Sequence, residues 1–159
     1  MHPMIQKVTE DISSRSEESR QAYLNKIDSA SQNSSDRSQM PCSNLAHGIA
    51  ACSAEDKLSI QQAGHLNIGI VTAYNDMLSA HQPYENYPKI IRAAANKEGA
   101  TVQVAGGVPA MCDGVTQGQD GMDLSLFSRD VIALSTAVSL SHDLYDAVVC
   151  LGICDKIVP

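Results

Sequence analysis

The sequence predicts an α/β protein: a three-layer domain with a mostly parallel sheet and crossover helices, preceded by amino-terminal helices. Three apolar or β-branched segments, residues 67–73, 101–105 and 145–153, have the composition of buried strands. Between them, residues 83–98 and 123–142 carry apolar side chains at helical spacing. This alternation is typical of parallel sheets with right-handed crossovers. The carboxyl ends of all the strands are therefore expected at one edge, where such sheets bind ligands.

The chain before the first strand divides into two parts. Apolar residues three or four apart in residues 1–30 predict one or two amphipathic helices, and the Ser- and Asn-rich residues 29–38 predict a connector. We therefore expect a helical segment and connector over residues 1–38 and an α/β domain over residues 39–159. The domain is expected to be incomplete at its carboxyl end, because the chain stops just after the third strand. Residues 39–52 predict a loop with a short helix.

Local signals mark the ends of two helices. Ser53 stands before Glu55 and Asp56, which predicts an N-cap followed by acidic residues in the first turn. Gly64 is the predicted end of that helix, and Gly99 is the predicted end of the helix over residues 83–98.

Composition excludes several classes of protein. Eleven basic residues stand against 18 acidic ones, for a formal charge of −7, and no basic cluster predicts a nucleic-acid or anionic membrane surface. No apolar run approaches the roughly 18–20 residues of a membrane span, and no secretory signal is evident. The odd number of cysteines favours a reduced, cytoplasmic protein in which Cys42, Cys52 and Cys150 are small buried hydrophobic residues.

Cys154-Asp155-Lys156, directly after the third strand, places unlike ligands side by side. Thiolate sulfur suits iron–sulfur clusters or zinc, whereas carboxylate oxygen suits magnesium or manganese. A strand-end thiol beside a solvated acid and base is the alternative interpretation, and these three residues leave it open.

Asp113 and His81 follow the other two predicted strands. Asp113 lies in a glycine-rich loop and is 155 − 113 = 42 residues from Asp155, about one helix plus one strand. Parallel crossover topology could therefore bring both carboxylates to one hard cation. His81 could reach a substrate as a catalytic residue, and a hydrogen-bonded structural histidine is the alternative.

Residues 106–122, 125–133 and 152–159 together resemble the dihydroxy-acid and 6-phosphogluconate dehydratase family, and the resemblance extends from about Arg37 to the end. It implies that Cys154 ligates an iron–sulfur cluster, which we take to be of the 4Fe–4S kind. It also implies that Asp113 and Asp155 bind Mg²⁺ and that Lys156 belongs to the catalytic site as a carbamylated metal ligand. A carbamate offers oxygen to a dication, whereas an ammonium group, with a pKa of about 10.4, repels it.

Departures from the family pattern select its 6-phosphogluconate type. Residues 75–84 lack the Pro-Cys-Asn of the dihydroxy-acid type, and residues 37–39, 44–48 and 115–120 resemble the other type. The resemblance implies a hydro-lyase that converts 6-phospho-D-gluconate to 2-dehydro-3-deoxy-6-phospho-D-gluconate in the Entner–Doudoroff pathway. It further implies a homodimer, with another cluster cysteine and a serine base beyond Pro159, so we expect the chain alone to be inactive.

Two other functions stay open at this point. One is a dehydratase of the same family that acts on another sugar acid or a dihydroxy acid. The other, from a different class, is a non-catalytic metal-binding or assembly module.

Overall fold

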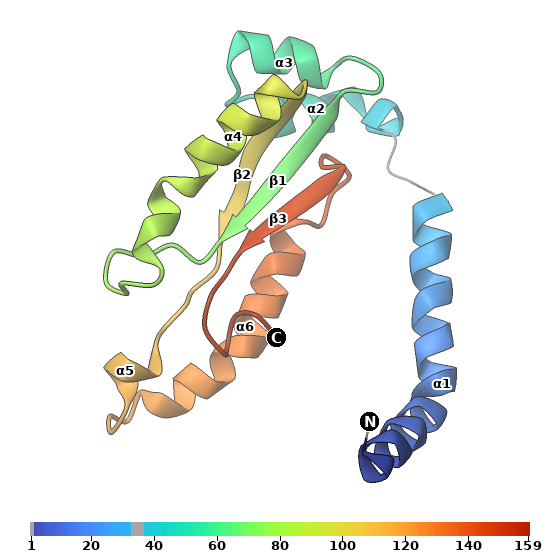
Figure 1. The fold of residues 1–159 in the computed structure, drawn as a ribbon. Coiled ribbons are helices and arrows are strands. Elements are labelled where there is room, and N and C mark those ends of the chain that lie inside the picture. Colours follow the sequence, from blue (N-terminus) through green and yellow to red (C-terminus); the bar gives the residue numbers. More distant parts are fainter. Residues whose placement is uncertain (1, 33–36) are drawn as a thin grey trace. The chain divides into compact units, whose positions relative to one another are not determined.

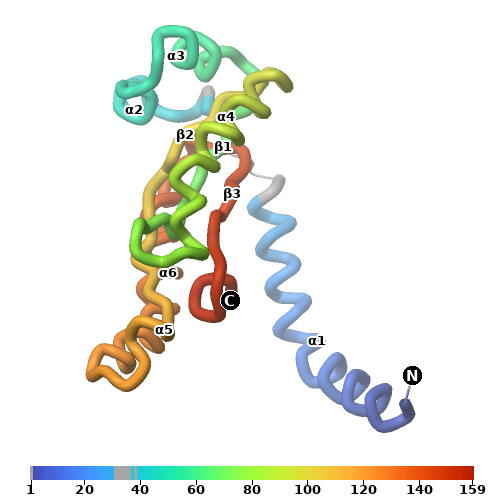
Figure 2. The backbone as a smooth tube through the Cα atoms, turned by 60° about the vertical axis from the view of Figure 1, so that its left-hand side comes forward, coloured from blue at the N-terminus to red at the C-terminus, as the bar shows by residue number. Residues whose placement is uncertain are grey.

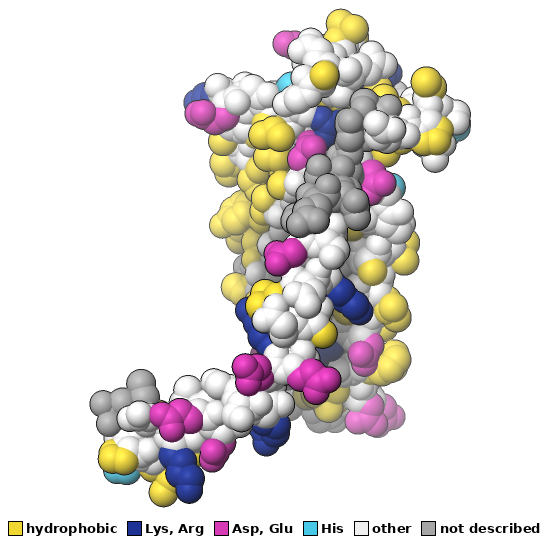
Figure 3. Space-filling model, turned by 90° about the vertical axis from the view of Figure 1, so that its right-hand side faces the viewer, with side chains coloured by type: hydrophobic (Ala, Val, Ile, Leu, Met, Phe, Trp, Pro, Cys, Tyr) yellow, Lys and Arg dark blue, Asp and Glu magenta, His cyan; other side chains and the backbone are white. Residues whose placement is uncertain are grey.

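The computed structural model of the protein describes residues 2–32 and 37–159. The chain divides into two compact units, residues 1–35 and 36–159. The described part of the first unit is one long helix, α1 (Pro3–Gln32), which confirms the helical prediction for this region (Figure 1). Acidic and basic side chains both occur along α1 (Figure 3), and most of its apolar side chains are exposed.

The predicted connector begins too early in the sequence. Residues 29–32 continue α1 instead of forming a loop, and residues 33–36 of the prediction lie outside the described residues. The hydroxyl of Ser29 donates a hydrogen bond to the carbonyl of Asn25, at 2.8 Å, one turn earlier. A serine hydroxyl satisfied in this way is compatible with a helix, so the polar composition is misleading here.

The second unit is built on a parallel sheet whose strand order is β2-β1-β3. The strands are β1 (Leu66–Thr72), β2 (Ala100–Gly107) and β3 (Ala147–Leu151), close to the predicted segments. β1 is the central strand and pairs in parallel with both neighbours. The register with β2 shifts after Ile70, which is a local bulge in that strand pair.

Helices connect the strands on both sides of the sheet. α4 (Tyr87–Lys97) links β1 to β2, and α6 (Met122–Ser139) links β2 to β3. The chain moves from β1 to one neighbour and then crosses to the other, so right-handed crossovers place the two helices on opposite faces. Figure 1 and Figure 2 show this arrangement, and the predicted three-layer α/β fold is confirmed.

Shorter helices surround the ends of the sheet. Near the amino ends of the strands lie the 3₁₀ turn η1 (Arg37–Gln39), α2 (Cys42–Ile49) and α3 (Ala54–Ile60) (Figure 1). Beyond the carboxyl ends lie the 3₁₀ turn η2 (Gln82–Glu85) and α5 (Asp113–Thr116).

The predicted helix start at Ser53 is confirmed, because its side chain accepts a hydrogen bond from the backbone N–H of Asp56 at 3.0 Å. α3 ends at Ile60, before the predicted stop at Gly64. Gly64 instead adopts a φ of 77° in the turn that leads to β1. Gly99 has a φ of 76° immediately after α4 and ends that helix as predicted.

Two hydrophobic clusters hold these layers together. The first consists of buried residues from β1, the loops after β1 and β2, and α6: Val71, Ala73, Val108 and Ile132. The second joins α2, α3 and the segment before β3 through Ile49, Ile60 and Leu144. Gly69 lets the ring of Tyr145 lie against β1, since a Cβ there would come within 2.7 Å of the ring.

The prediction that three cysteines are small buried residues is wrong for two of them. Cys42 and Cys150 are exposed, and Cys52 is half-buried. Cys42 is the first residue of a short helix, and Cys150 lies on β3, an edge strand that is less covered than β1. Among the described helices, none is both long enough and apolar enough to cross a bilayer.

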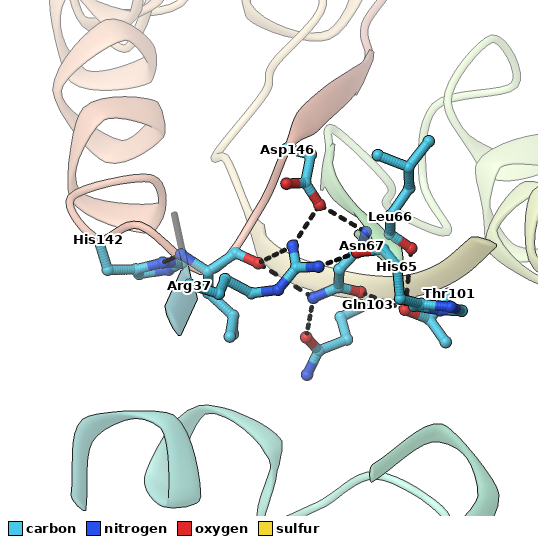
Figure 4. Close-up of polar contacts among 9 residues, drawn as sticks. Arg37, His65, Leu66, Asn67, Thr101, Gln103, His142 and Asp146 are labelled. Atoms are coloured by element: carbon cyan, nitrogen blue, oxygen red, sulfur yellow. Dashed lines mark hydrogen bonds and ion pairs between the residues drawn. The ribbon is translucent and has the colours of Figure 1, made fainter. Parts of the chain in front are cut away.

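A polar network stabilises the end of the sheet that lies farthest from the strand-end loops (Figure 4). The guanidinium of Arg37 forms an ion pair with Asp146 and donates to the carbonyl of His65. The same Asp146 carboxylate accepts a hydrogen bond from the backbone N–H of Asn67 at 2.7 Å. Arg37 therefore ties η1 to the segments that lead into β1 and β3.

The side chain of Asn67 is fully buried and uses both ends of its amide. Its Nδ2 donates to Gln103 Oε1 at 2.8 Å and to the carbonyl of Leu144 at 3.3 Å. Its Oδ1 accepts a hydrogen bond from Thr101 Oγ1 at 2.9 Å. The amide therefore connects the amino-terminal parts of all three strands, because Leu144 lies just before β3.

We predict that Asn67→Ala lowers the free energy of unfolding by about 3 kcal/mol, since it removes the hydrogen bonds of the amide to β2 and to the segment before β3. The matched control is Asn86→Ala, because Asn86 is exposed and its side chain does not cap α4. Urea denaturation of the two variants would measure the difference. Equal midpoints for both variants would contradict this role for the network.

Candidate functional site

The loops after the three strands meet at the carboxyl edge of the sheet (Figure 1). The strand order reverses at β1, because the chain first adds β2 on one side and then β3 on the other. Ligands bind at such a reversal, in the crevice between the two loops that leave in opposite directions. β3 is the neighbour of β1 on the side away from β2, so the loops beside this reversal are residues 73–81 after β1 and residues 152–158 after β3. Cys154 Sγ, from the second loop, lies 3.7 Å from His81 Nε2 in the first.

Lys156 brings the two predicted carboxylates together. Its side chain is buried, with 3% of its surface exposed, and its Nζ forms an ion pair with Asp113 Oδ2. The same Nζ lies 3.4 Å from Asp155 Oδ1. Asp113 is also held by Ser125, whose hydroxyl donates to Asp113 Oδ1 at 2.8 Å. The loop after β2 and the segment after β3 therefore converge on one cationic group.

The electrostatics of this cluster favour positive charge between the carboxylates. The hydrogen bond with Lys156, and then the one with Ser125, hold the pKa of Asp113 below its usual value. The hydrogen bond to Asp113 raises the pKa of Lys156, against the opposing effect of burial. Asp113 is therefore ionised and Lys156 is protonated at neutral pH. The ammonium group occupies the place where a hard cation would share the same oxygens.

Cys154 has an unusual backbone conformation. Its φ is 77°, and within residues 2–32 and 37–159 it is the one residue other than glycine with a positive φ. A residue with a side chain is strained in this conformation, and such strain is found most often at functional sites. Burial raises the pKa of the Cys154 thiol, and the nearby Cys112 and Asp155 raise it further. Without a metal, Cys154 is therefore a protonated thiol rather than a nucleophilic thiolate.

His81 is enclosed rather than open to solvent, with 1% of its surface exposed. Its Nδ1 lies 2.7 Å from the carbonyl oxygen of Ala73, at the end of β1. The ring of Tyr84 meets it edge-on, with the ring centroids 6.2 Å apart. Both ring nitrogens of His81 thus face atoms of the protein.

A groove of about 620 Å³ lies between α6 and the segment after β3. Its walls are mostly apolar, Arg129 and Lys156 are the basic residues along it, and Asp130 is the acidic residue. Arg129 Nη2 also donates to the backbone carbonyl of Asp155 at 3.3 Å. The groove could therefore hold a small organic anion beside the carboxylate cluster.

Sequence reasoning missed the contributions of Ser125 and Arg129. Both are polar residues in the first half of α6, within a segment whose pattern indicates only an apolar stripe. The signal that could have found them is their place in that helix, which starts beside the loop containing Asp113. Cys112 is close enough to Cys154 to raise the pKa of the Cys154 thiol, although the sequence predicts no role for Cys112.

The described residues contain no group of three His, Cys, Asp or Glu side chains arranged to hold a metal ion. The donors present are nevertheless of the two kinds that the sequence predicts. Oxygens of Asp113 and Asp155 converge on one positive charge, and the sulfur of Cys154 lies in a partly buried position next to them. The carboxylates suit a hard cation and the sulfur suits iron.

Comparisons with known proteins agree with this architecture. The sequence model described as "Dihydroxy-acid/6-phosphogluconate dehydratase N-terminal" matches residues 65–159. The phosphogluconate dehydratases of Escherichia coli K12 and Pseudomonas aeruginosa are 60% and 55% identical to the chain over all 159 of its residues. A dihydroxy-acid dehydratase of Akkermansia muciniphila is 37% identical over 92 residues, which are 58% of the chain and 16% of that protein.

The chain spans about a quarter of the length of the phosphogluconate dehydratases that it matches, 26% in both cases. The match to the family covers the whole sheet from just before β1 and includes every predicted site residue. The parallel sheet, the loops that meet at its carboxyl edge and these similarities lead to one conclusion: the chain belongs to the dihydroxy-acid/6-phosphogluconate dehydratase family.

Proposed function

We propose that the chain is the amino-terminal part of a phosphogluconate dehydratase. Such a hydro-lyase removes water from 6-phospho-D-gluconate and forms 2-dehydro-3-deoxy-6-phospho-D-gluconate, a step of the Entner–Doudoroff pathway. The observation that carries the proposal is the extent of the similarity. Relatives with this name match the entire chain at 55–60% identity, whereas the dihydroxy-acid dehydratase matches 58% of it at 37%.

The proposed ligands follow from the convergence of donors at the carboxyl edge. Asp113 and Asp155 would hold Mg²⁺, and Cys154 would hold one iron of an iron–sulfur cluster of the 4Fe–4S kind. When bound, these groups supply Lewis-acid chemistry, which assists the departure of hydroxide and stabilises negative charge on the sugar acid. The electrostatic fit is favourable, because the two carboxylates already stabilise a positive charge at Lys156 Nζ.

Lys156 would contribute to the catalytic site either as an ammonium group or as a carbamate. As an ammonium it neutralises Asp113, and that arrangement competes with a metal ion for the same oxygens. Carbamylation would change its side-chain charge from +1 to −1 and would add oxygen to the pair of carboxylates. Three anionic groups would then surround the cation site, which suits Mg²⁺.

The groove beside Lys156 is the proposed place of the phosphorylated sugar acid. Arg129 lies along its wall, and a guanidinium group is suited to a carboxylate or a phosphate. We further propose that the full-length enzyme is cytoplasmic and forms a homodimer. The five free thiols are compatible with a reducing compartment, and the dimer rests on the family resemblance.

One prediction of this proposal concerns the substrate of the full-length protein. We expect 6-phosphogluconate to be dehydrated about 10- to 100-fold more efficiently than gluconate, because a charge-assisted contact to phosphate contributes about 1.5–3 kcal/mol. Formation of the 2-keto acid measures the rate, and residues 1–159 alone should show no turnover. Equal kcat/KM values for the two substrates would favour another sugar acid. A colourless, inactive full-length protein would favour a non-catalytic module.

Another prediction concerns Asp155, the more exposed of the two proposed carboxylate ligands. The side chain of Asp155 is 72% exposed, so Asp155→Asn should leave folding intact. We expect it to lower kcat/KM by a factor on the order of 10², and to reduce bound Mg²⁺, because one anionic ligand is lost. Asp123→Asn, in the exposed first turn of α6, is the matched control. Undiminished activity and magnesium content in the Asp155 variant would remove this residue from the site.

A further inference from the structure

His81 is buried, and both nitrogens of its ring make specific contacts. It is the largest polar side chain of the strand-end loops that is completely buried, and each ring nitrogen has its own partner. One partner is the carbonyl of Ala73 at 2.7 Å, and the other is Cys154 Sγ at 3.7 Å. The ring therefore bridges the end of β1 and the segment after β3.

The partners determine which nitrogen carries hydrogen. A carbonyl oxygen only accepts, so Nδ1 of His81 is the donor to Ala73. This bond orients the ring and leaves Nε2 directed at Cys154 Sγ. In the free thiol the sulfur supplies the hydrogen of that contact.

The His81 side of this contact is shielded from solvent. His81 is 1% exposed, Cys154 is half-buried, and the ring of Tyr84 meets the imidazole edge-on. A hydrogen bond to sulfur is stronger in such a medium than in water. The backbone of Cys154 also has a φ of 77°, a conformation that is strained for a residue with a side chain.

We propose that His81 is a positioning residue for the cluster ligand: its ring, held by the carbonyl of Ala73, keeps Cys154 Sγ in place through the contact at Nε2. The inference rests on the proposed function, because it requires a cluster at Cys154. Hydrogen bonds to the ligand sulfurs of iron–sulfur clusters are among the factors that set their reduction potential. Partners of metal ligands also orient them, and losing one such partner costs about 10- to 100-fold in metal affinity or activity.

Two substitutions of His81 separate its two contacts. In His81→Asn the side-chain amide nitrogen takes the place of Nδ1, so the bond to the Ala73 carbonyl is kept and the contact with sulfur is lost. In His81→Gln the longer side chain brings an N–H group to the position of Nε2. His142→Asn is the matched control, since His142 is exposed and precedes β3 at the opposite end of the sheet.

The test uses the full-length protein with its cluster in place. Two readouts are the midpoint potential of the cluster, followed by absorbance during an electrochemical titration, and the rate of cluster loss in the presence of EDTA. We expect His81→Asn to change the midpoint potential and to accelerate cluster loss about 10-fold. His81→Gln should recover most of both properties, and His142→Asn should match the wild type.

The outcomes distinguish this inference from the function on which it rests. A wild-type protein that has neither a cluster nor turnover would overturn both. A loaded, active wild type whose potential and cluster lifetime do not change in His81→Asn would overturn the role of His81 alone. The same role would be rejected if His81→Gln lost the cluster as fast as His81→Asn, because a general packing defect would then explain both variants.

Discussion

The pairing of β1 with a parallel neighbour on each side is the constraint on which the rest of this structure depends. Parallel strands cannot be joined by a tight turn, so each connection needs a crossover helix, and every strand then ends at the same edge. Because the second crossover returns the chain past β1, β3 pairs with β1, and the loops after these two strands lie side by side at that edge. The contact between His81 and Cys154 is a direct result of this topology.

The two ends of the sheet have different tasks. At the amino end, the amide of Asn67 and the ion pair of Arg37 with Asp146 connect the strands through hydrogen bonds. At the carboxyl end, two carboxylates converge on one buried ammonium group beside Cys154. The positive φ of Cys154 is costly, and such strain persists where the surrounding structure holds it in place.

The sequence was sufficient for the strands, the crossover helices and the proximity of Asp113 to Asp155. Periodicity and loop position determine those features, and a separation of one helix plus one strand returns the chain to the same edge. Other features depend on tertiary packing that periodicity does not encode. Nothing local to Lys156 predicts its burial, and nothing local to Cys154 predicts a positive φ. Residues 29–32 show the opposite case, where loop-like composition was overridden by helical hydrogen bonding.

The central claim is that the carboxyl edge of this sheet is a metal site of a dehydratase, with Cys154 as a ligand of iron. The most direct measurement is anomalous X-ray scattering at the iron edge from crystals of the full-length protein, prepared without oxygen. We predict an iron peak within bonding distance of Cys154 Sγ, about 2.3 Å by analogy with other metal–thiolate bonds. A fully loaded protein whose iron lies elsewhere, with Cys154 as a free thiol, would contradict it.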